Sequence, residues 1–194
     1  MGQPAQILAY TIEEYLDIER NSEIKHEFHD GEIFAMAGGT FAHNRLSANI
    51  SGSLWNKLKG KKCRPSSSDQ QIAVSRSKYV YPDLSVICGE FEWYEEQPHA
   101  AKNPVLIVEV LSNETESYDR GGKFMRYRQL PTFKEYILIS QRELLVEVFY
   151  RKENDLWAIS TYQNLSDTIH LQSIDVTISL EDIYEGVEIS SVED

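Results

Sequence analysis

Two short apolar stretches, each carrying one carboxylate, place the strongest constraint on how this 194-residue chain can fold. The first is Tyr79-Val-Tyr-Pro-Asp-Leu-Ser-Val-Ile-Cys88, and the second is Pro104-Val-Leu-Ile-Val-Glu-Val-Leu-Ser112. Both have the composition of strands. A carboxylate inside such a run is costly to bury alone, so it needs a partner. The sequence therefore predicts two neighbouring strands that bring the two carboxylates, Asp83 and Glu109, together.

Two adjacent carboxylates repel each other unless a proton or a cation lies between them. A hard divalent cation bound by oxygen ligands satisfies both groups. We therefore expect Asp83 and Glu109 to form a metal site at the end of a sheet. Structural alternatives remain open, because Asp83 after Pro82 is also typical of a turn, and Glu109 could be an outward-facing strand residue.

Helical signals occur at three places before and after these strands. Thr11 and Glu14 have the spacing of a capping box, which predicts a helix through about Glu19. Residues 43–60 form the best helical pattern, with apolar side chains at every fourth position and Gly60 as the C-cap. Residues 119–130 are predicted as a third helix, which Pro131 ends.

The remaining segments read mainly as strands and turns. Asp30-Gly31 marks the turn of a hairpin over residues 24–37, and Ser66-Ser67-Ser68 is predicted as a loop. Further strands are expected at residues 71–75, 79–88, 104–112, 134–140, 144–151 and 157–163. This order predicts one α/β domain over residues 1–194, with a mixed central β-sheet flanked by helices.

The charge of the chain is strongly acidic and unevenly distributed. A formal net charge of −12 argues against a general nucleic-acid binder. Residues 57–64 and 120–128, however, hold 9 of the 19 basic residues. Such segments can attract a phosphate backbone locally, although solvated helix faces and turns would give the same pattern.

Cysteine usage and hydropathy suggest a cytoplasmic protein. Cys63 and Cys88 are the two cysteines, and without CxxC spacing they predict free thiols in a reducing compartment, with neither a disulfide scaffold nor a zinc site. No secretory signal pattern is visible, and no apolar run approaches the ~20 residues that a transmembrane helix needs. We therefore expect no membrane partner.

The order of the polar residues resembles the PD-(D/E)XK nuclease superfamily: Pro82-Asp83, then Glu109-Val110-Leu111, then a helix bearing Lys123. In that superfamily, Asp and Glu hold a divalent cation and a lysine positions or activates the attacking water. The superfamily pattern places this lysine two residues after Glu, where this chain has Leu111. The resemblance implies that Lys123 takes its role, since some members carry the lysine on the neighbouring helix.

A longer ordered set of motifs is similar to a bacterial family of uncharacterised restriction-endonuclease-like proteins. The set covers roughly residues 11–151, which implies a restriction-endonuclease-like core. Its members are the EEYL helix, Lys25-x-Glu27-x-x-x-Asp30-Gly31-Glu32, His43-Asn44, Pro82-Asp83-Leu84, Glu109-Val110-Leu111-Ser112, Asp119-x-x-x-Lys123-x-x-x-Tyr127 and Glu135-Tyr136-Ile137.

The resemblance assigns roles to the acidic and basic residues. Asp83 and Glu109 would be metal ligands, and Glu27 an additional ligand from the N-terminal hairpin. Lys123 would stabilise charge on the phosphate or position the nucleophile. His43 could contact a phosphate or accept a proton.

Each of these residues also has a structural alternative. Asp119, Lys123 and Tyr127 follow one another at four-residue spacing, so they line one helix face. That face would present an acid, an ammonium group and a phenol to the metal site, which makes Tyr127 a further candidate catalytic residue. Asp119 could instead cap its helix, Tyr127 could belong to the core, and Lys123 could be a surface cation. Glu27 could pair with Lys25 or Arg45, and His43 could be a helix-terminal residue without a ligand role.

The combined prediction is a metal-dependent endonuclease that hydrolyses phosphodiester bonds in DNA, with Mg²⁺ as the cation and Mn²⁺ able to substitute. The alternative is a catalytically silent nuclease fold that acts in binding or assembly within a mobile-element or defence system. A third hypothesis is an acidic protein whose carboxylates are only structural. A homodimer is also plausible, with Phe91-x-Trp93-Tyr94 at the interface or folded back on its own domain.

Overall fold

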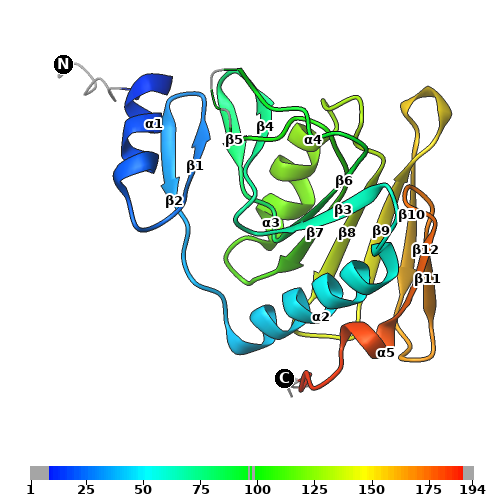
Figure 1. Cartoon of the computed structure of the whole chain (residues 1–194). Coiled ribbons are helices and arrows are strands. Elements are labelled where there is room, and N and C mark those ends of the chain that lie inside the picture. Colours follow the sequence, from blue (N-terminus) through cyan, green and yellow to red (C-terminus); the bar gives the residue numbers. More distant parts are fainter. Residues whose placement is uncertain (1–8, 96, 98, 190–194) are drawn as a thin grey trace, which may run out of the picture.

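The computed structural model describes residues 9–95, 97 and 99–189 (Figure 1). Its elements in chain order are α1 (Ile12–Asn21), β1 (His26–His29), β2 (Glu32–Ala35), α2 (Phe41–Leu58), β3 (Cys63–Ser67), β4 (Ile72–Ser75), β5 (Lys78–Val80), β6 (Leu84–Cys88), β7 (Pro104–Leu111), α3 (Glu116–Tyr118), the π-helix η1 (Asp119–Lys123), α4 (Phe124–Tyr127), β8 (Glu135–Ser140), β9 (Val146–Arg151), the 3₁₀ helix η2 (Glu153–Asp155), β10 (Trp157–Tyr162), β11 (Thr168–Leu171), β12 (Val176–Ser179) and α5 (Leu180–Ile183).

A six-stranded sheet forms the centre of the molecule, in the order β10-β9-β8-β7-β6-β3. β7 and β8 are parallel, and the other neighbouring strands are antiparallel, so the predicted mixed α/β architecture is confirmed. A second sheet, β2-β1-β5-β4, carries the N-terminal hairpin, and β11 and β12 form a separate two-stranded sheet.

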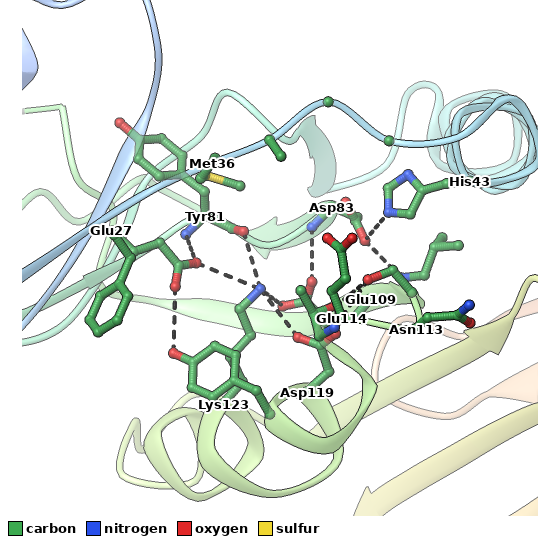
Figure 2. A pocket seen from close by; sticks show the side chains of 18 of the residues that line it. Glu27, Met36, His43, Tyr81, Asp83, Glu109, Asn113, Glu114, Asp119 and Lys123 are labelled. Carbon is green, nitrogen blue, oxygen red and sulfur yellow. Dashed lines mark hydrogen bonds and ion pairs between the residues drawn. The ribbon is translucent and has the colours of Figure 1, made fainter.

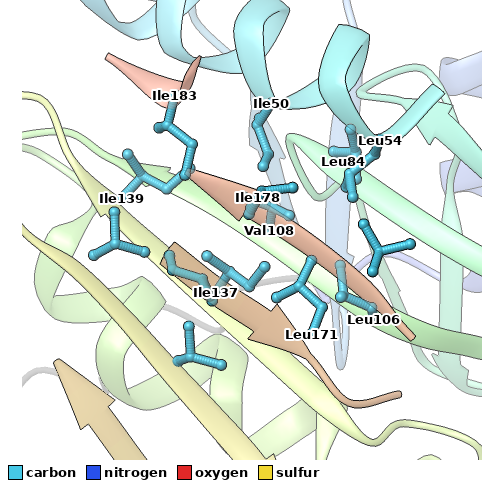
Figure 3. Packing of buried hydrophobic residues seen from close by; sticks show 14 of the residues in the cluster. Ile50, Leu54, Leu84, Leu106, Val108, Ile137, Ile139, Leu171, Ile178 and Ile183 are labelled. Atoms are coloured by element: carbon cyan, nitrogen blue, oxygen red, sulfur yellow. The ribbon is translucent and has the colours of Figure 1, made fainter. Parts of the chain in front are cut away.

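The two faces of β7 pack against different cores because side chains alternate along a strand. Leu106, Val108 and Val110 belong to the core beneath α2, whose inner side is a stripe of buried leucine and isoleucine (Figure 3). Ile107 and Leu111 belong to a second core on the opposite face, beside α4. Glu109 lies between Ile107 and Leu111, two residues from each. Its side chain therefore points to the same face of the sheet, which the η1–α4 segment covers.

The N-terminal hairpin packs against α1 and β5 through aromatic contacts. Tyr15 of α1 stacks on Phe28 of β1, with ring centroids 4.8 Å apart, and on Tyr79 of β5, at 5.8 Å. The capping box at the start of α1 is confirmed. Gly31 adopts φ +100° in the hairpin turn, where a Cβ would lie 2.7 Å from the Cβ of Ala9. These contacts hold α1, the β1–β2 hairpin and β5 together as one unit.

Two strand predictions need correction. Residues 79–88 do not form one strand, because the chain leaves the four-stranded sheet after β5 and enters the six-stranded sheet at β6. Pro82 and Asp83 occupy this crossing, where the proline nitrogen has no proton for a ladder. The loop predicted at residues 66–68 is also wrong in part, since Ser66 and Ser67 pair with β6.

The predicted helix over residues 119–130 begins earlier and contains a π-helical turn. α3, η1 and α4 follow one another without a break, and η1 includes Gly121 and Gly122. A π-helical turn within an α-helix is frequent at functional sites. None of the helices in the described ranges, including the 18-residue α2, is long and apolar enough to cross a bilayer.

The prediction of free thiols is wrong, because Cys63 and Cys88 form a disulfide bond. The two residues are directly opposite each other on the antiparallel strands β3 and β6, with Cα atoms 3.9 Å apart. Their pairing depends on β3, whose sequence Cys-Arg-Pro-Ser-Ser has few of the residues that favour strands. The disulfide joins an edge strand to the strand that follows Asp83.

Candidate active site

A cleft of about 740 Å³ lies between the β1–β2 hairpin and the adjacent ends of β6 and β7 (Figure 2). The extended segment 35–40, which joins β2 to α2, forms another wall, and residues 112–115 after β7 form a third. Five of the six predicted catalytic residues line it, namely Glu27, His43, Asp83, Glu109 and Lys123. The sixth, Tyr127, lies beneath the cleft floor.

Asp83 and Glu109 are fixed beside each other by reciprocal backbone contacts. The backbone N–H of Asp83 donates to Oε2 of Glu109 at 3.3 Å, and the N–H of Val110 donates to Oδ2 of Asp83 at 2.7 Å. Each carboxylate therefore accepts a hydrogen bond from the backbone of the segment that carries the other. The predicted juxtaposition of the two carboxylates is confirmed, and the alternative of a solvent-facing Glu109 is wrong, since this residue is 2 % exposed.

The amino group of Lys123 lies among three carboxylates (Figure 2). Its Nζ is 3.1 Å from Oε1 of Glu109, 3.5 Å from Oδ1 of Asp119 and 3.6 Å from Oε1 of Glu27. Burial favours a neutral amine, but the carboxylates, Glu109 first, outweigh burial and hold the pKa of Lys123 well above its usual value. Lys123 is therefore a buried cation and not a surface one.

Leu111 shows why the lysine comes from the helix. This residue is buried in the second core and packs with apolar side chains, so a cation at its position would lose that packing. Lys123 reaches Glu109 from η1, one layer above the sheet. The structure thus brings a lysine to the glutamate without the Glu-x-Lys spacing.

The carboxylates of the cleft differ in their affinity for protons. Burial raises the pKa of Glu109 well above its usual value, and neighbouring carboxylates add to the effect against the opposing charge of Lys123. Burial alone would raise the pKa of Glu27 as well. Lys123, His29 and the backbone N–H of Tyr81 outweigh burial, so the pKa of Glu27 is lowered. Glu109 therefore takes up a proton more readily than Glu27.

Tyr127 is both a core residue and a hydrogen-bond donor to the site. It is fully buried, and its hydroxyl donates to Oε1 of Glu109 at 2.9 Å. Asp119 does not cap its helix: its carboxylate accepts from the hydroxyl of Thr115 at 2.7 Å and contacts Lys123. The four-residue spacing of Asp119, Lys123 and Tyr127 thus places all three on the helix face that points toward the site.

His43 extends the cluster from the first turns of α2. Its Nε2 lies 3.3 Å from Oδ2 of Asp83, and this contact raises the pKa of His43. Thr40 caps the helix by accepting from the N–H of His43 at 3.1 Å. A Cβ at Gly39 would lie 2.7 Å from Nδ1 of the His43 ring, so the wall segment can pass this close only with glycine.

Two residues of the site were not predicted from the sequence. His29 lies 3.1 Å from the Glu27 carboxylate through Nε2, and the hydroxyl of Tyr118 lies 3.0 Å from the same nitrogen. Arg126 donates to the hydroxyl of Tyr118. Strand alternation after Glu27 could have indicated His29, whereas no sequence pattern marks Tyr118.

The alternative partners proposed for Glu27 are occupied elsewhere. Lys25 binds Asp69 at 3.1 Å, and Arg45 donates to the backbone carbonyl of Glu185 at 3.2 Å. The two basic segments also differ from each other. Residues 57–64 present exposed cations at the end of α2 and on β3, whereas the cations of residues 120–128 engage carboxylates and aromatic rings.

The aromatic segment after β6 folds back on its own chain. Phe91 stacks on Trp93 with centroids 5.3 Å apart, and Tyr94 meets Tyr79 edge-on at 6.0 Å. Trp93 remains 45 % exposed. A dimer interface at this segment stays a prediction.

The cleft provides oxygen donors suited to a hard divalent cation. Within the described ranges, no three histidine, cysteine or acidic side chains form a ready metal-binding group. Three carboxylates nevertheless surround one ammonium group, and Asp83 adjoins them, so acidic groups outnumber the cation; burial first, and then the neighbouring carboxylates, raise the pKa of Glu109. Mg²⁺ typically binds one or two carboxylates together with substrate phosphates and water, so Asp83 and Glu109 fit this cation.

The family comparison agrees with this arrangement. The model of the Uma2 family, described as "Putative restriction endonuclease", matches residues 12–181. This chain belongs to the Uma2 family. The match extends from α1 to α5, so it includes every residue of the candidate site.

Two relatives from a Synechocystis strain extend over most of the chain. "Uncharacterized protein slr1290" is 37% identical over 176 residues, which are 90% of this chain and 91% of the relative. "Uncharacterized protein sll1609" is 35% identical over 151 residues, which are 77% and 85% of the two chains. A crystal structure from Anabaena variabilis, described as a "putative nuclease belonging to DUF820", superposes with a TM-score of 0.73 at 15% identity and covers 90% of this chain and 97% of its own. That similarity shows that the two chains share a fold.

Proposed function

We propose that this Uma2-family protein is a metal-dependent nuclease that hydrolyses phosphodiester bonds in DNA. The family and the fold support a nuclease in general. The observation that carries the finer proposal is the 3.1 Å contact between Lys123 and Glu109, together with the backbone bonds that join Glu109 to Asp83. An acid pair that can hold a cation, next to a buried ammonium group, can stabilise the charge that develops during phosphodiester hydrolysis.

Asp83 and Glu109 would hold Mg²⁺, with Glu27 as an additional ligand and Mn²⁺ as a substitute cation. When bound, the cation would polarise the phosphodiester and lower the pKa of a water molecule. Lys123 offsets negative charge that develops on the phosphate, because its ammonium group is preorganised and shielded from water. It therefore stabilises the transition state without reorganisation of its own.

Tyr127 and His43 orient the two carboxylates, and His43 can also accept a proton. Tyr127 fixes one oxygen of Glu109, which leaves the carboxylate in a single orientation. His43 fixes Asp83 through Nε2, and it lies at the cleft wall, where it can accept a proton or contact a phosphate oxygen. A homodimer and a cytoplasmic location are further parts of the proposal that rest on the sequence, and the Cys63–Cys88 disulfide removes the free-thiol argument for that location.

A catalytically silent nuclease fold is the competing proposal. It is favoured by the absence, among the described residues, of a three-residue metal-binding group, and by the three carboxylates that already contact Lys123. Such a protein would bind a nucleic acid or assemble with a partner without cleaving it. Metal-dependent turnover separates the two proposals.

The test is cleavage of single-stranded and duplex DNA in Mg²⁺, Mn²⁺ or EDTA by the wild type, by Glu109→Gln and by Glu135→Gln. Glu135 is a matched control because it is also a buried strand glutamate, but it binds Ser173 on the far side of the sheet. We expect cleavage in either metal, a loss of about 100-fold or more in Glu109→Gln, and retained activity in Glu135→Gln. Equal cleavage by the wild type and Glu109→Gln would refute the proposed site.

A further inference from the structure

The wall of the cleft that the β1–β2 hairpin forms carries a half-exposed aromatic ring. In the β1–β2 hairpin, Phe34 is directly opposite Glu27, so the two side chains share a face of the hairpin. Phe28 and Ile33, the next pair along, face the other way and pack with Tyr15 of α1 in a separate apolar cluster. Alternation along the two strands therefore places Phe34 beside Glu27 on the cleft wall, and Phe34 is 47 % exposed there.

The ring of Phe34 is only partly covered by its own chain. Its centroid lies 5.2 Å from that of His29, which supports the ring from one side. Arg126 lies at the same cleft and stacks on Tyr118, with the guanidinium carbon 5.1 Å from the ring centroid. A cleft that holds both an exposed aromatic ring and a cation has the two features with which proteins bind unpaired nucleic-acid bases.

The depth of the reactive groups limits what can reach them. Glu109 is 2 % exposed and Lys123 is 7 % exposed, so a phosphate must enter the cleft to contact either residue. The cleft volume of about 740 Å³ lies within the range of pockets that enclose small molecules. A nucleotide whose base is unpaired can turn into such a space, whereas a base held in a duplex must first be unstacked.

The charge of the cleft lining bears on the same choice of substrate. The lining holds six carboxylates against three lysine or arginine side chains, among them Arg126 and Arg142, in a chain of net charge −12. Duplex DNA carries one negative charge per about 1.7 Å of its axis, twice the density of one strand. Repulsion by this excess of carboxylates therefore penalises a duplex more than a single strand.

We propose that the cleft binds an unpaired nucleic-acid strand and that Phe34 stacks on one of its bases. This inference rests on the proposed function, because it assigns the substrate class of the same site. The hairpin, the 35–40 segment and residues 112–115 enclose the strand, and a phosphate adjoining the stacked base lies next to the buried acid pair. Single-stranded DNA, or an unpaired end or flap on a duplex, is the form that enters.

Binding tests the inference separately from cleavage. Fluorescence anisotropy is measured in EDTA, at one fixed salt concentration, with labelled oligonucleotides of one sequence as a single strand, as a blunt duplex and as a duplex with an unpaired flap. The proteins are the wild type, Phe34→Ala, Phe34→Trp and Phe41→Ala. Phe41 is the matched control because it is 78 % exposed at the start of α2 and does not line the cleft.

We expect the single strand and the flap to bind about tenfold or more tightly than the blunt duplex. Phe34→Ala should weaken single-strand binding by about tenfold, since one stacked base contributes that order of affinity. Phe34→Trp should retain binding because it keeps an aromatic face, and Phe41→Ala should match the wild type. Equal or tighter binding of the blunt duplex, equal effects of the two alanine variants, or no binding of any oligonucleotide would each overturn the inference.

The same oligonucleotides with Mg²⁺ separate this inference from the proposed hydrolysis. Selective binding of the single strand without cleavage would contradict hydrolysis and leave the inference standing. Cleavage of the blunt duplex at the rate of the single strand would support hydrolysis and overturn the inference. If Phe34→Ala does not fold, as judged by circular dichroism, the duplex comparison on the wild type still decides the substrate class.

Discussion

Replacing Lys123 by methionine should destabilise the metal-free protein strongly, because the change keeps the shape of the side chain and removes its charge. Lys123 contacts three carboxylates at 3.1–3.6 Å, and Glu109 among them is 2 % exposed. Removing one partner of a buried ion pair costs about 3–5 kcal/mol, since the other charge stays buried without compensation. We expect a loss of this size at about pH 8.

The loss should shrink as the pH falls. Burial already raises the pKa of Glu109, and without Lys123 that pKa rises further. A folded state with a raised carboxyl pKa binds a proton that the unfolded state releases, so stability increases as pH falls toward the ordinary glutamate pKa. One such proton changes the free energy of unfolding by about 1.4 kcal/mol per pH unit.

The assay is urea unfolding in EDTA at several pH values, followed by circular dichroism. Lys78→Met is the matched control, because Lys78 also contacts a carboxylate, Asp30, at 3.1 Å, but in solvent, where such pairs contribute about 0–1 kcal/mol. The double variant Lys123→Met/Glu109→Gln should regain part of the lost stability. A loss in Lys123→Met no larger than in Lys78→Met, or no recovery in the double variant, would refute the reasoning.

Two further predictions concern pH and redox conditions. The hydrogen bond to Asp83 raises the pKa of His43 above its usual value of 6.5, so the stabilising contact is complete below that value and is lost as the pH rises through the folded-state pKa. The stability difference between the wild type and His43→Asn in EDTA should therefore be larger at about pH 5.5 than at about pH 9, and urea unfolding showing equal differences would contradict the contact. The Cys63–Cys88 disulfide closes a loop with a sequence separation of 25, so reduction should cost about 3 kcal/mol in the free energy of unfolding. Thiol titration that finds both cysteines free in the native, unreduced protein would contradict the disulfide.

The acid pair could be predicted from the sequence because its signal is local. Asp83 adjoins an apolar strand and Glu109 lies within one, and two carboxylates brought together there require a proton or a cation between them. The role of Lys123 was implied by the resemblance to the PD-(D/E)XK superfamily, and its four-residue spacing to Asp119 and Tyr127 supported that assignment. The inference about the acid pair needed only the composition of the two strands and the cost of burying charge.

What could not be predicted depends on contacts between distant segments. Cys63 pairs with Cys88 only because a strand poor in β-formers lies at the sheet edge, which the local sequence does not show. His29 and Tyr118 join the site through a contact between the hairpin and α3. Phe34 faces the cleft because of the hairpin register, although its exposure depends on how the hairpin packs beside the sheet.

The central claim is that Asp83 and Glu109 together hold a divalent cation. Titration calorimetry with Mn²⁺ on the wild type, Asp83→Asn, Glu109→Gln and the control Glu135→Gln tests it most directly. We predict one Mn²⁺ per chain for the wild type and Glu135→Gln, and loss of that binding in Asp83→Asn and Glu109→Gln. Undiminished Mn²⁺ binding by both site variants would contradict the account.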